Sequence, residues 1–331
     1  MRVCRKYCSI TAGFAVFCIL CACLFAPRPL MLVWERLHQH WSRNSWSELL
    51  RVVGVESSVD GHVQLAYAYQ SPSEVPMPLI VSLHAWSSDY SRYDVLSEMA
   101  LRRGFNYIHP NFRGVNNKPV SCASPEAIAD IDDAITYCLS NWDVNADEIY
   151  VVGASGGGHA VCSLYFKTKH AIRAFYAWVP ITDLETWYYQ SKHRKLNYWA
   201  DIEQICGGSF DAEVARARSP IYMEIKGAPS AELHLFAGIE DGYTGSVPIS
   251  HSIRLFNRLC RESALPDQQL TLSEMYALLT RASSVTGEFI GGRAVYFKRE
   301  LPYWSLTIFD GGHELLPSYQ EEIIVADLFT R

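Results

Sequence analysis

Short apolar runs alternate with amphipathic stretches along most of the chain after residue 50. Compact apolar runs predict buried strands, and apolar residues at helical spacing predict the helices between them. This alternation is typical of an α/β fold, in which a mostly parallel sheet carries helices on both faces. The predicted strands cover 78–83, 105–108, 148–152, 172–179, 233–237, 294–297 and 304–309, and the predicted helices cover 127–139, 158–166 and 248–259.

Three segments depart from this alternation. An Asp-Gly pair joins residues 52–59 to residues 62–69 and predicts a β-hairpin, because such a pair accepts the positive φ angles of a tight turn. Residues 183–220 gather aromatic and basic side chains, and we expect a small cap insertion there rather than a second domain. Residues 30–50 carry three tryptophans among polar residues, which predicts a short amphipathic lead-in helix.

The first 29 residues have the features of a targeting segment. A basic start is followed by 20 uncharged residues, 7–26, and then by Pro27. This length lies between the ~7–15 residues of a signal-peptide core and the ~20 of a membrane-spanning helix. A retained signal anchor, a lipoprotein signal cut before Cys23 and a cleaved signal peptide all predict that residues 30–331, a single domain, are exported. Chance hydrophobicity is the fourth interpretation, and it predicts no export.

Composition excludes several classes of protein. Of the 331 residues 49% are hydrophobic and 19% are charged, which is typical of a globular core and excludes disorder or a coiled coil. The net charge of −6 gives no basic face, so we expect no nucleic-acid partner.

Cysteine usage gives no sign of a metal site. Five of the ten cysteines lie in the first 23 residues, and the other five form no C-x-x-C pair. We expect those five to be buried single thiols, although a Cys122–Cys138 disulfide remains open. No metal or organic cofactor is implied.

The segment Gly153-Ala154-Ser155-Gly156-Gly157 follows one predicted strand directly and opens a predicted helix. G-x-S-x-G in this position is a nucleophile elbow, a strained turn that exposes the serine hydroxyl. Small neighbours are needed because the helix passes close by. The helix N-terminus adds free N–H groups where negative charge develops during acyl transfer.

A nucleophilic serine needs a base and an acid that orients the base. His313 fits the base, because it follows the strand 304–309 within Asp-Gly-Gly-His-Glu. Asp241 fits the acid, because it follows the strand 233–237 and precedes a glycine; Glu240 is its rival. The other late histidine, His251, falls inside a predicted helix, and we interpret it as a helix-face residue.

The oxyanion hole needs two N–H groups. We expect one from Gly156, directly after the nucleophile, and the other from Trp86, in the loop after the strand 78–83. His84 in the same loop is interpreted as a bracing residue.

With these motifs the sequence resembles the α/β-hydrolase fold, and within it the catalytic domains of the prolyl oligopeptidase type and the related acyl-carbohydrate esterases. The resemblance covers roughly residues 60–331 and implies that Ser155, Asp241 and His313 form the triad. The blocks that carry it are 83–86, 109–114, 153–158, 241–248 and 310–314. Two positions depart from the family pattern. Ala85 stands where the family has glycine, which predicts about 1 kcal/mol of strain if that position needs a positive φ. The acid also lies further than usual from its Val-Pro.

The sequence leaves three functions open. An exported carboxylic-ester hydrolase acting on acylated carbohydrate is favoured, since no segment of β-propeller length precedes the matched region. The alternatives are a peptidase that cleaves short peptides and a catalytically inactive tethered binding protein. The substrate is accordingly a small molecule, a polysaccharide or a peptide. Trp187 and Trp199 are candidates for stacking on sugars, with packing of the cap against the core as the alternative. Arg113 is a candidate for meeting a substrate carboxylate, although bracing of the loop after the preceding strand is favoured.

Overall fold

The computed structural model describes residues 45–225 and 231–329. Its ten-stranded sheet has the order β1-β2-β4-β3-β5-β6-β7-β10-β9-β8. The six strands from β4 to β10 in this order run parallel, and antiparallel strands extend the sheet on both sides. The strands are β1 (Arg51–Glu56), β2 (Val63–Tyr69), β3 (Met77–Leu83), β4 (Asn106–Pro110), β5 (Val144–Ala154), β6 (Ala174–Trp178), β7 (Glu232–Gly238), β8 (Phe289–Ile290), β9 (Arg293–Glu300) and β10 (Trp304–Phe309).

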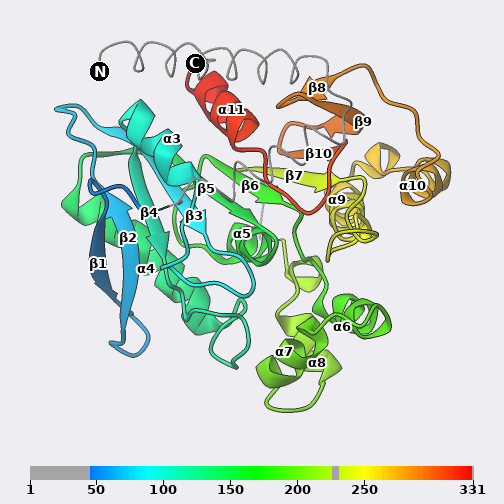
Figure 1. Cartoon of the computed structure of the whole chain (residues 1–331), viewed down its shortest axis with the longest axis horizontal. Coiled ribbons are helices and arrows are strands. Elements are labelled where there is room, and N and C mark those ends of the chain that lie inside the picture. The colour runs from blue at the N-terminus through cyan, green and yellow to red at the C-terminus, as the bar shows by residue number, and fades with distance from the viewer. Residues whose placement is uncertain (1–44, 226–230, 330–331) are drawn as a thin grey trace, which may run out of the picture. The chain divides into compact units, whose positions relative to one another are not determined.

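Helices cover both faces of the sheet, as Figure 1 shows. On one face α3 and α11 are joined by ion pairs from Arg102 and Arg103 to Glu321. On the other face α4, α5 and α9 pack against the strands. The helices are α3 (Leu96–Arg103), α4 (Pro125–Asn141), α5 (Gly156–Lys167), α6 (Leu184–His193), α7 (Tyr198–Ile205), α8 (Ala212–Ala217), α9 (Ser250–Glu262), α10 (Leu272–Leu279) and α11 (Pro317–Phe329), with short 3-10 turns η1 (Pro220–Tyr222) and η2 (Pro266–Gln268).

The central strands are apolar along their whole length because both faces are covered. Every residue of β4, β6 and β10 is buried. The predicted α/β fold with a mostly parallel sheet is therefore confirmed. Local signals start the helices: the Ser124 hydroxyl accepts a hydrogen bond from the Ala127 N–H at the start of α4, where Pro125 stands at the first helical position.

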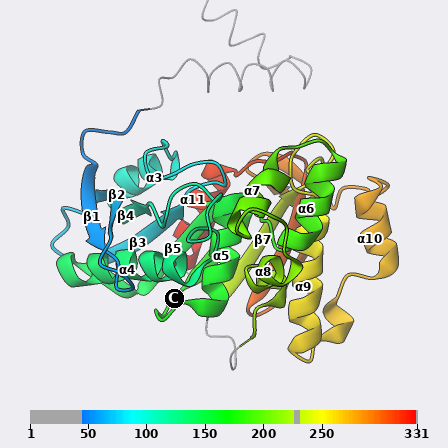
Figure 2. The same ribbon diagram turned by 90° about the horizontal axis from the view of Figure 1, so that it is seen from below.

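The predicted cap is a cluster of three helices. Residues 183–220, between β6 and β7 in the chain, form α6, α7 and α8, which extend below the sheet in Figure 1 and lie in front of it in the view from below in Figure 2. Asp183 starts α6 by accepting a hydrogen bond from the Thr186 N–H at 3.0 Å. Leu184, Trp187 and Ile202 of the cap belong to a small apolar cluster that also includes Trp86 and Val247 of the neighbouring loops.

Several sequence predictions need correction. The β1–β2 connection is a six-residue loop, 57–62, rather than a two-residue turn, although Gly61 does adopt a positive φ of 71°. Helices α3, α10 and α11 were not predicted. The five cysteines of the described residues are all free thiols, so Cys122 and Cys138 form no disulfide.

The predictions for the first 44 residues, including most of the lead-in helix, lie outside the described residues. Within the part of the chain that the structure describes, no helix is both long and apolar enough to cross a membrane. Residues Ser47–Arg331 form one compact unit, which contains the sheet and the cap.

Candidate active site

Ser155 lies at the junction of β5 and α5. Its backbone has φ 59° and ψ −116°, a conformation that L-residues rarely adopt. The Ser155 N–H donates to the Trp178 carbonyl at the end of the neighbouring strand, at 2.9 Å. The turn therefore has the strained strand-to-helix geometry of a nucleophile elbow.

The glycines around Ser155 are required by space. A Cβ on Gly157 would lie 2.1 Å from the Leu83 carbonyl oxygen, and one on Gly153 would lie 2.6 Å from the Gly157 backbone. A Cβ on Gly158 would lie 2.7 Å from the Trp178 carbonyl oxygen. Helix α5 therefore starts in contact with the ends of β3 and β6, and no larger residue fits there.

The loop after β3 lies directly beside the start of α5. A Cβ on Gly156 would lie 2.3 Å from the Trp86 backbone nitrogen. The two residues that the sequence nominates for an oxyanion hole are thus neighbours in space. Ala85 does not adopt a positive φ, so the strain expected from its replacing glycine is absent.

His84 braces this loop. Its Nε2 lies 2.7 Å from the Asn111 carbonyl oxygen, and its ring stacks on Phe112 with 3.9 Å between ring centroids. Burial lowers the pKa of His84 to about 4, so the ring is neutral near pH 7. A neutral, buried, hydrogen-bonded histidine is consistent with the bracing role expected from the sequence.

Asp241 and His313 are in direct contact. His313 Nδ1 lies 2.7 Å from Asp241 Oδ2. The other carboxylate oxygen accepts hydrogen bonds from the N–H groups of Gly242 at 2.9 Å and Val247 at 3.0 Å. The Asp241 side chain is 1% exposed and that of His313 is 22% exposed. The carboxylate is therefore held in place by three hydrogen bonds, one of them to Nδ1 of a partly exposed imidazole.

Backbone contacts join the acid loop to the histidine loop. The Glu240 N–H donates to the Gly311 carbonyl at 2.9 Å, and a Cβ on Gly238 would lie 2.3 Å from the Gly312 carbonyl oxygen. A Cβ on Gly311 would lie 2.4 Å from the Phe309 ring, whereas one on Gly312 would have open space out to 3.9 Å. Packing therefore requires a glycine at position 311 but not at position 312.

Glu240, the alternative candidate for the acid, binds Arg281 and not His313. Glu240 makes two hydrogen bonds to the Arg281 guanidinium, at 2.9 and 2.6 Å, and its side chain is 44% exposed. Arg281 in turn lies over the Tyr243 ring. Glu240 therefore belongs to a surface cluster, and Asp241 is the carboxylate that meets His313.

The three residues follow strands whose carboxyl ends meet at one edge of the parallel sheet. Ser155 follows β5, Asp241 follows β7 and His313 follows β10. Within the described residues the structure records the Asp241–His313 hydrogen bond but none between Ser155 and His313. Catalytic hydrogen bonds are often long in ligand-free enzymes and tighten when substrate binds.

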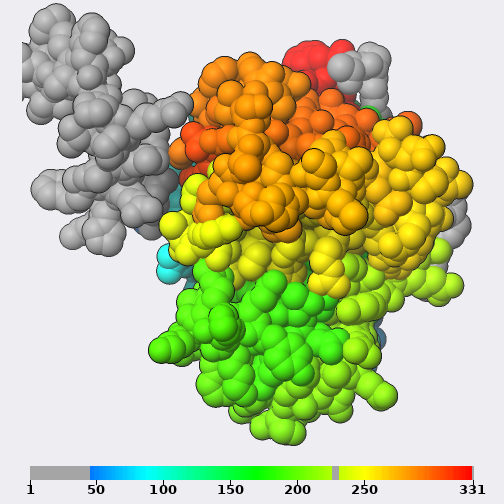
Figure 3. All heavy atoms as spheres, turned by 90° about the vertical axis from the view of Figure 1, so that its right-hand side faces the viewer, coloured from blue at the N-terminus to red at the C-terminus, as the bar shows by residue number. Residues whose placement is uncertain are grey.

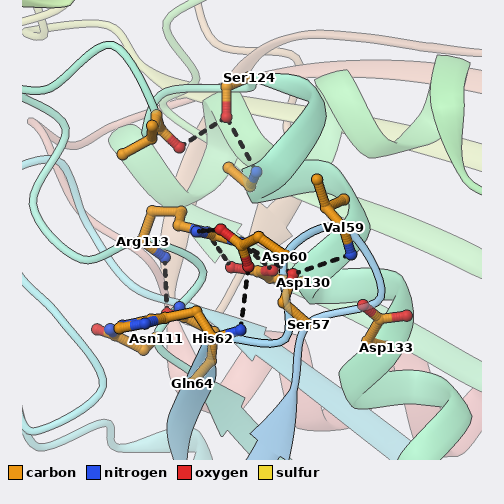
Figure 4. A network of polar contacts seen from close by, with 12 residues as sticks. Ser57, Val59, Asp60, His62, Gln64, Asn111, Arg113, Ser124, Asp130 and Asp133 are labelled. Carbon is orange, nitrogen blue, oxygen red and sulfur yellow. Dashed lines mark hydrogen bonds and ion pairs between the residues drawn. The ribbon is translucent and has the colours of Figure 1, made fainter.

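Arg113 is not available for substrate. Figure 4 shows its guanidinium between Asp60 and Asp130, with Ser57 beside it. Its side chain is 7% exposed, and the partner carboxylate of Asp130 is fully buried. The proposed substrate contact is wrong because these three partners already take the donors of the guanidinium, which ties the β1–β2 loop to α4.

The two cap tryptophans have different environments. Trp187 is fully buried and donates its indole N–H to the Ser246 carbonyl at 3.0 Å, so its proposed stacking on sugars is wrong. Trp199 is half-buried, with the Lys192 ammonium 5.1 Å from its ring centroid. Of the two, only Trp199 still offers a surface. The cap is the green lobe beside α9 and α10 in Figure 3.

Two cap residues that the sequence did not single out reach the loops of the site. Asp201 Oδ2 accepts a hydrogen bond from the Trp86 indole N–H at 3.0 Å. Arg194 donates to the carbonyls of Gly245 and Ser246 in the acid loop. No sequence signal marks these residues, because their partners lie more than 50 positions away.

Comparison with solved structures gives the same fold. A puromycin-hydrolyzing peptidase of Mycobacterium tuberculosis matches with a TM-score of 0.57 and 14% identity, over 85% of this chain and 39% of that one. An acylaminoacyl peptidase of Pyrococcus horikoshii matches with a TM-score of 0.56 and 16% identity, over 85% and 41%. The chain thus spans about two fifths of these peptidases. An esterase of Pyrococcus furiosus matches with a TM-score of 0.55 and 14% identity, over 86% and 93%.

The fold and the elbow together define the class: an α/β-hydrolase-fold protein with Ser155 at the nucleophile elbow. A family model identifies a narrower group within this class. The BD-FAE family model matches residues 67–259, more than half of the chain, and the protein belongs to that family. No curated protein sequence matches the chain significantly.

Proposed function

We propose that this protein hydrolyses carboxylic esters through an acyl-enzyme formed on Ser155. The observation that carries the proposal is the hydrogen bond between His313 and the buried Asp241, at the sheet edge where the elbow presents Ser155. A serine alone is a weak nucleophile, and the buried dyad is what supplies a base of fixed orientation.

In this mechanism Ser155 Oγ attacks the acyl carbon while His313 Nε2 takes the hydroxyl proton. Asp241 accepts the Nδ1 hydrogen bond, which selects the tautomer that leaves Nε2 able to receive a proton. The resulting imidazolium returns the proton to the leaving alcohol. Water then attacks the acyl-enzyme by the same steps in reverse order. The N–H groups of Gly156 and Trp86 stabilise the oxyanion in both tetrahedral intermediates.

One feature supports an ester substrate over a peptide. The half-buried Trp199 offers an aromatic face of the kind that stacks on a sugar ring, so an acylated carbohydrate is our preferred substrate. The peptidase alternative is retained because a likeness to two peptidases covers 85% of this chain.

The first test compares small acetyl esters with proline- and alanine-type peptide anilides, using the full chain. Ester cleavage without anilide cleavage supports the proposal. Anilide cleavage with a comparable kcat/KM would favour the peptidase alternative instead. Ser155→Ala should lower kcat by at least ~10³-fold. A loss smaller than tenfold contradicts the nucleophile assignment. A phosphonate probe that labels the wild type but not Ser155→Ala excludes an inactive binding protein.

The carbohydrate part of the proposal has its own test. Trp199→Ala should raise KM for an acetylated polysaccharide and leave KM for a small acetyl ester unchanged. Equal effects on both substrates contradict stacking by Trp199.

We further propose that the domain is exported and attached to a membrane through residues 1–29. Membrane fractionation of the full chain, compared with a variant starting at residue 30, tests this.

A further inference from the structure

Trp86 is held on three sides. Its backbone lies against Gly156 at the start of α5, its indole N–H donates to Asp201 in α7, and its ring meets Trp187 of α6. The ring centroids of the two tryptophans are 4.8 Å apart at an interplanar angle of 77°. The Trp86 side chain is only 2% exposed. The residue that presents the expected oxyanion N–H is therefore fixed by cap residues more than 100 positions later in the chain.

The same cap helices hold the acid loop. The Trp187 indole N–H donates to the Ser246 carbonyl at 3.0 Å, and Arg194 donates to the same carbonyl at 3.2 Å. Trp187 thus contacts the Trp86 ring on one side and the acid loop on the other. Tyr198 stacks on Trp187 with 4.7 Å between ring centroids, which joins α7 to this contact.

We propose that Asp201 is a positioning residue for the oxyanion hole, acting through the Trp86 indole to hold the backbone N–H of Trp86 beside Gly156. The inference rests on the proposed function, because it assumes that this N–H binds the oxyanion. It assigns the cap insertion a role in catalysis itself, in addition to any role in substrate access.

The chemistry of the contact suits this role. A carboxylate is a stronger acceptor for an indole N–H than a neutral group. The Asp201 side chain is half-buried, and burial raises its pKa, while the hydrogen bond from Trp86 acts in the opposite direction. Loss of the carboxylate would leave a buried indole N–H without its acceptor, and the loop could then rotate to hydrate it. A shift of the oxyanion donor lowers kcat without weakening ground-state binding.

The test compares Asp201→Ala and Asp201→Asn with a matched control. Glu203→Ala is the control, since Glu203 lies on the same helix and bonds the Tyr188 hydroxyl at 2.8 Å instead of Trp86. On a small acetyl ester we expect Asp201→Ala to lower kcat about tenfold, with KM changed less than about threefold. Asp201→Asn keeps an oxygen acceptor and should retain most of kcat. Glu203→Ala should leave both constants near the wild-type values.

Two further measurements test whether the substitution at Asp201 lowers kcat through Trp86 and the oxyanion hole. The rate ratio between an oxygen ester and its thiono analogue reports on the oxyanion hole, because sulfur accepts hydrogen bonds poorly. This ratio should fall in Asp201→Ala. Trp86→Phe removes the indole N–H together with part of the ring and keeps the backbone N–H, so its kcat should fall at least as far as that of Asp201→Ala. The double variant should then be no slower than Trp86→Phe alone, because both substitutions remove the same hydrogen bond.

The outcomes separate this inference from the proposed function. Wild-type kcat in Asp201→Ala, a change in KM alone, or additive effects in the double variant would overturn the inference while Ser155→Ala remains inactive. A change in KM alone would instead make Asp201 a substrate contact. Activity that survives in Ser155→Ala would overturn the proposed function itself. Asp201→Leu, which is close to aspartate in size but has no acceptor, keeps the test valid if the alanine variant folds poorly.

Discussion

Gly245 lies against the carboxylate of Asp241 so closely that a Cβ at Gly245 would be 2.2 Å from Asp241 Oδ1. The same Cβ would lie 2.8 Å from the Cβ of His313. The acid loop therefore closes over the dyad through a residue without a side chain, and this contact makes the Asp241–His313 geometry sensitive to a single methyl group.

Gly245→Ala should consequently lower kcat/KM about a hundredfold, because the methyl group displaces the carboxylate from the imidazole. Steady-state kinetics on a small acetyl ester measures this, with a thermal melt to verify folding. Gly312→Ala is the matched control, since the nearest atom to its added Cβ is 3.9 Å away. Similar losses of kcat/KM in both variants would show that an added methyl group lowers activity for a reason other than displacement of the Asp241 carboxylate.

Asp241→Asn should lower kcat by at least ~10³-fold, because the amide can donate to Nδ1 and so stabilise the unproductive histidine tautomer. The control is the same acid-to-amide change at the neighbouring residue, Glu240. Glu240→Gln should change kcat less than about threefold, since Glu240 bonds Arg281 rather than His313. If Glu240→Gln proved the more damaging variant, the acid assignment would have to be reversed.

Arg113→Ala should destabilise the fold by about 3 kcal/mol, because it leaves the buried Asp130 carboxylate without its cation. Urea unfolding measures the change, and kcat/KM of the folded fraction should stay near the wild-type value. Arg216→Ala removes a pair with Glu185 in which the arginine is 53% exposed, and should cost less than about 1 kcal/mol. A rise in KM of Arg113→Ala without loss of stability would restore the substrate-binding role.

Buried neutral histidines should make stability fall in mild acid. Burial lowers the pKa of His84, His159 and His251 from 6.5 to about 4 in the folded protein. Between these values the unfolded chain binds more protons, so the free energy of unfolding decreases as the pH falls from about 6.5 to about 4. Each histidine contributes a loss on the order of 3 kcal/mol across the full window.

His159→Gln tests this dependence. Near pH 5 the variant should take up about one proton fewer on unfolding, so its stability should fall less steeply with acid than that of the wild type. Urea midpoints measured from pH 7.5 to pH 4.5 provide the slope. Parallel curves for the two proteins would show that His159 does not titrate on unfolding.

The sheet was predictable because its strands are covered on both faces. Such strands are continuous apolar runs, and the runs at 148–152 and 304–309 were found within a few residues of β5 and β10. The helices α3, α10 and α11 were missed, although α10 begins with a capping box formed by Thr271 and Glu274, which is a local signal. Helix α10 exposes Leu272 and Tyr276, so its hydrophobic pattern does not indicate its buried side.

The elbow glycines illustrate what a local motif can state by itself. G-x-S-x-G after a strand requires small residues wherever the helix must approach other backbone, and the contacts of Gly156 and Gly157 bear out that requirement. For an aromatic residue the neighbouring sequence does not determine whether the side chain is buried. Trp187 and Trp199 look alike in the sequence, yet one is fully buried and the other is half-buried.

The sequence by itself therefore determined the fold class, the elbow at Ser155 and the order in which acid and base follow it. These depend on periodicity and on steric demands among residues close in the chain. Tertiary structure alone decided that Asp60 and Asp130 bind the Arg113 guanidinium and that Asp201 accepts a hydrogen bond from the Trp86 indole. Each of these depends on which side chains long-range packing brings within about 3 Å, and no local pattern encodes that distance.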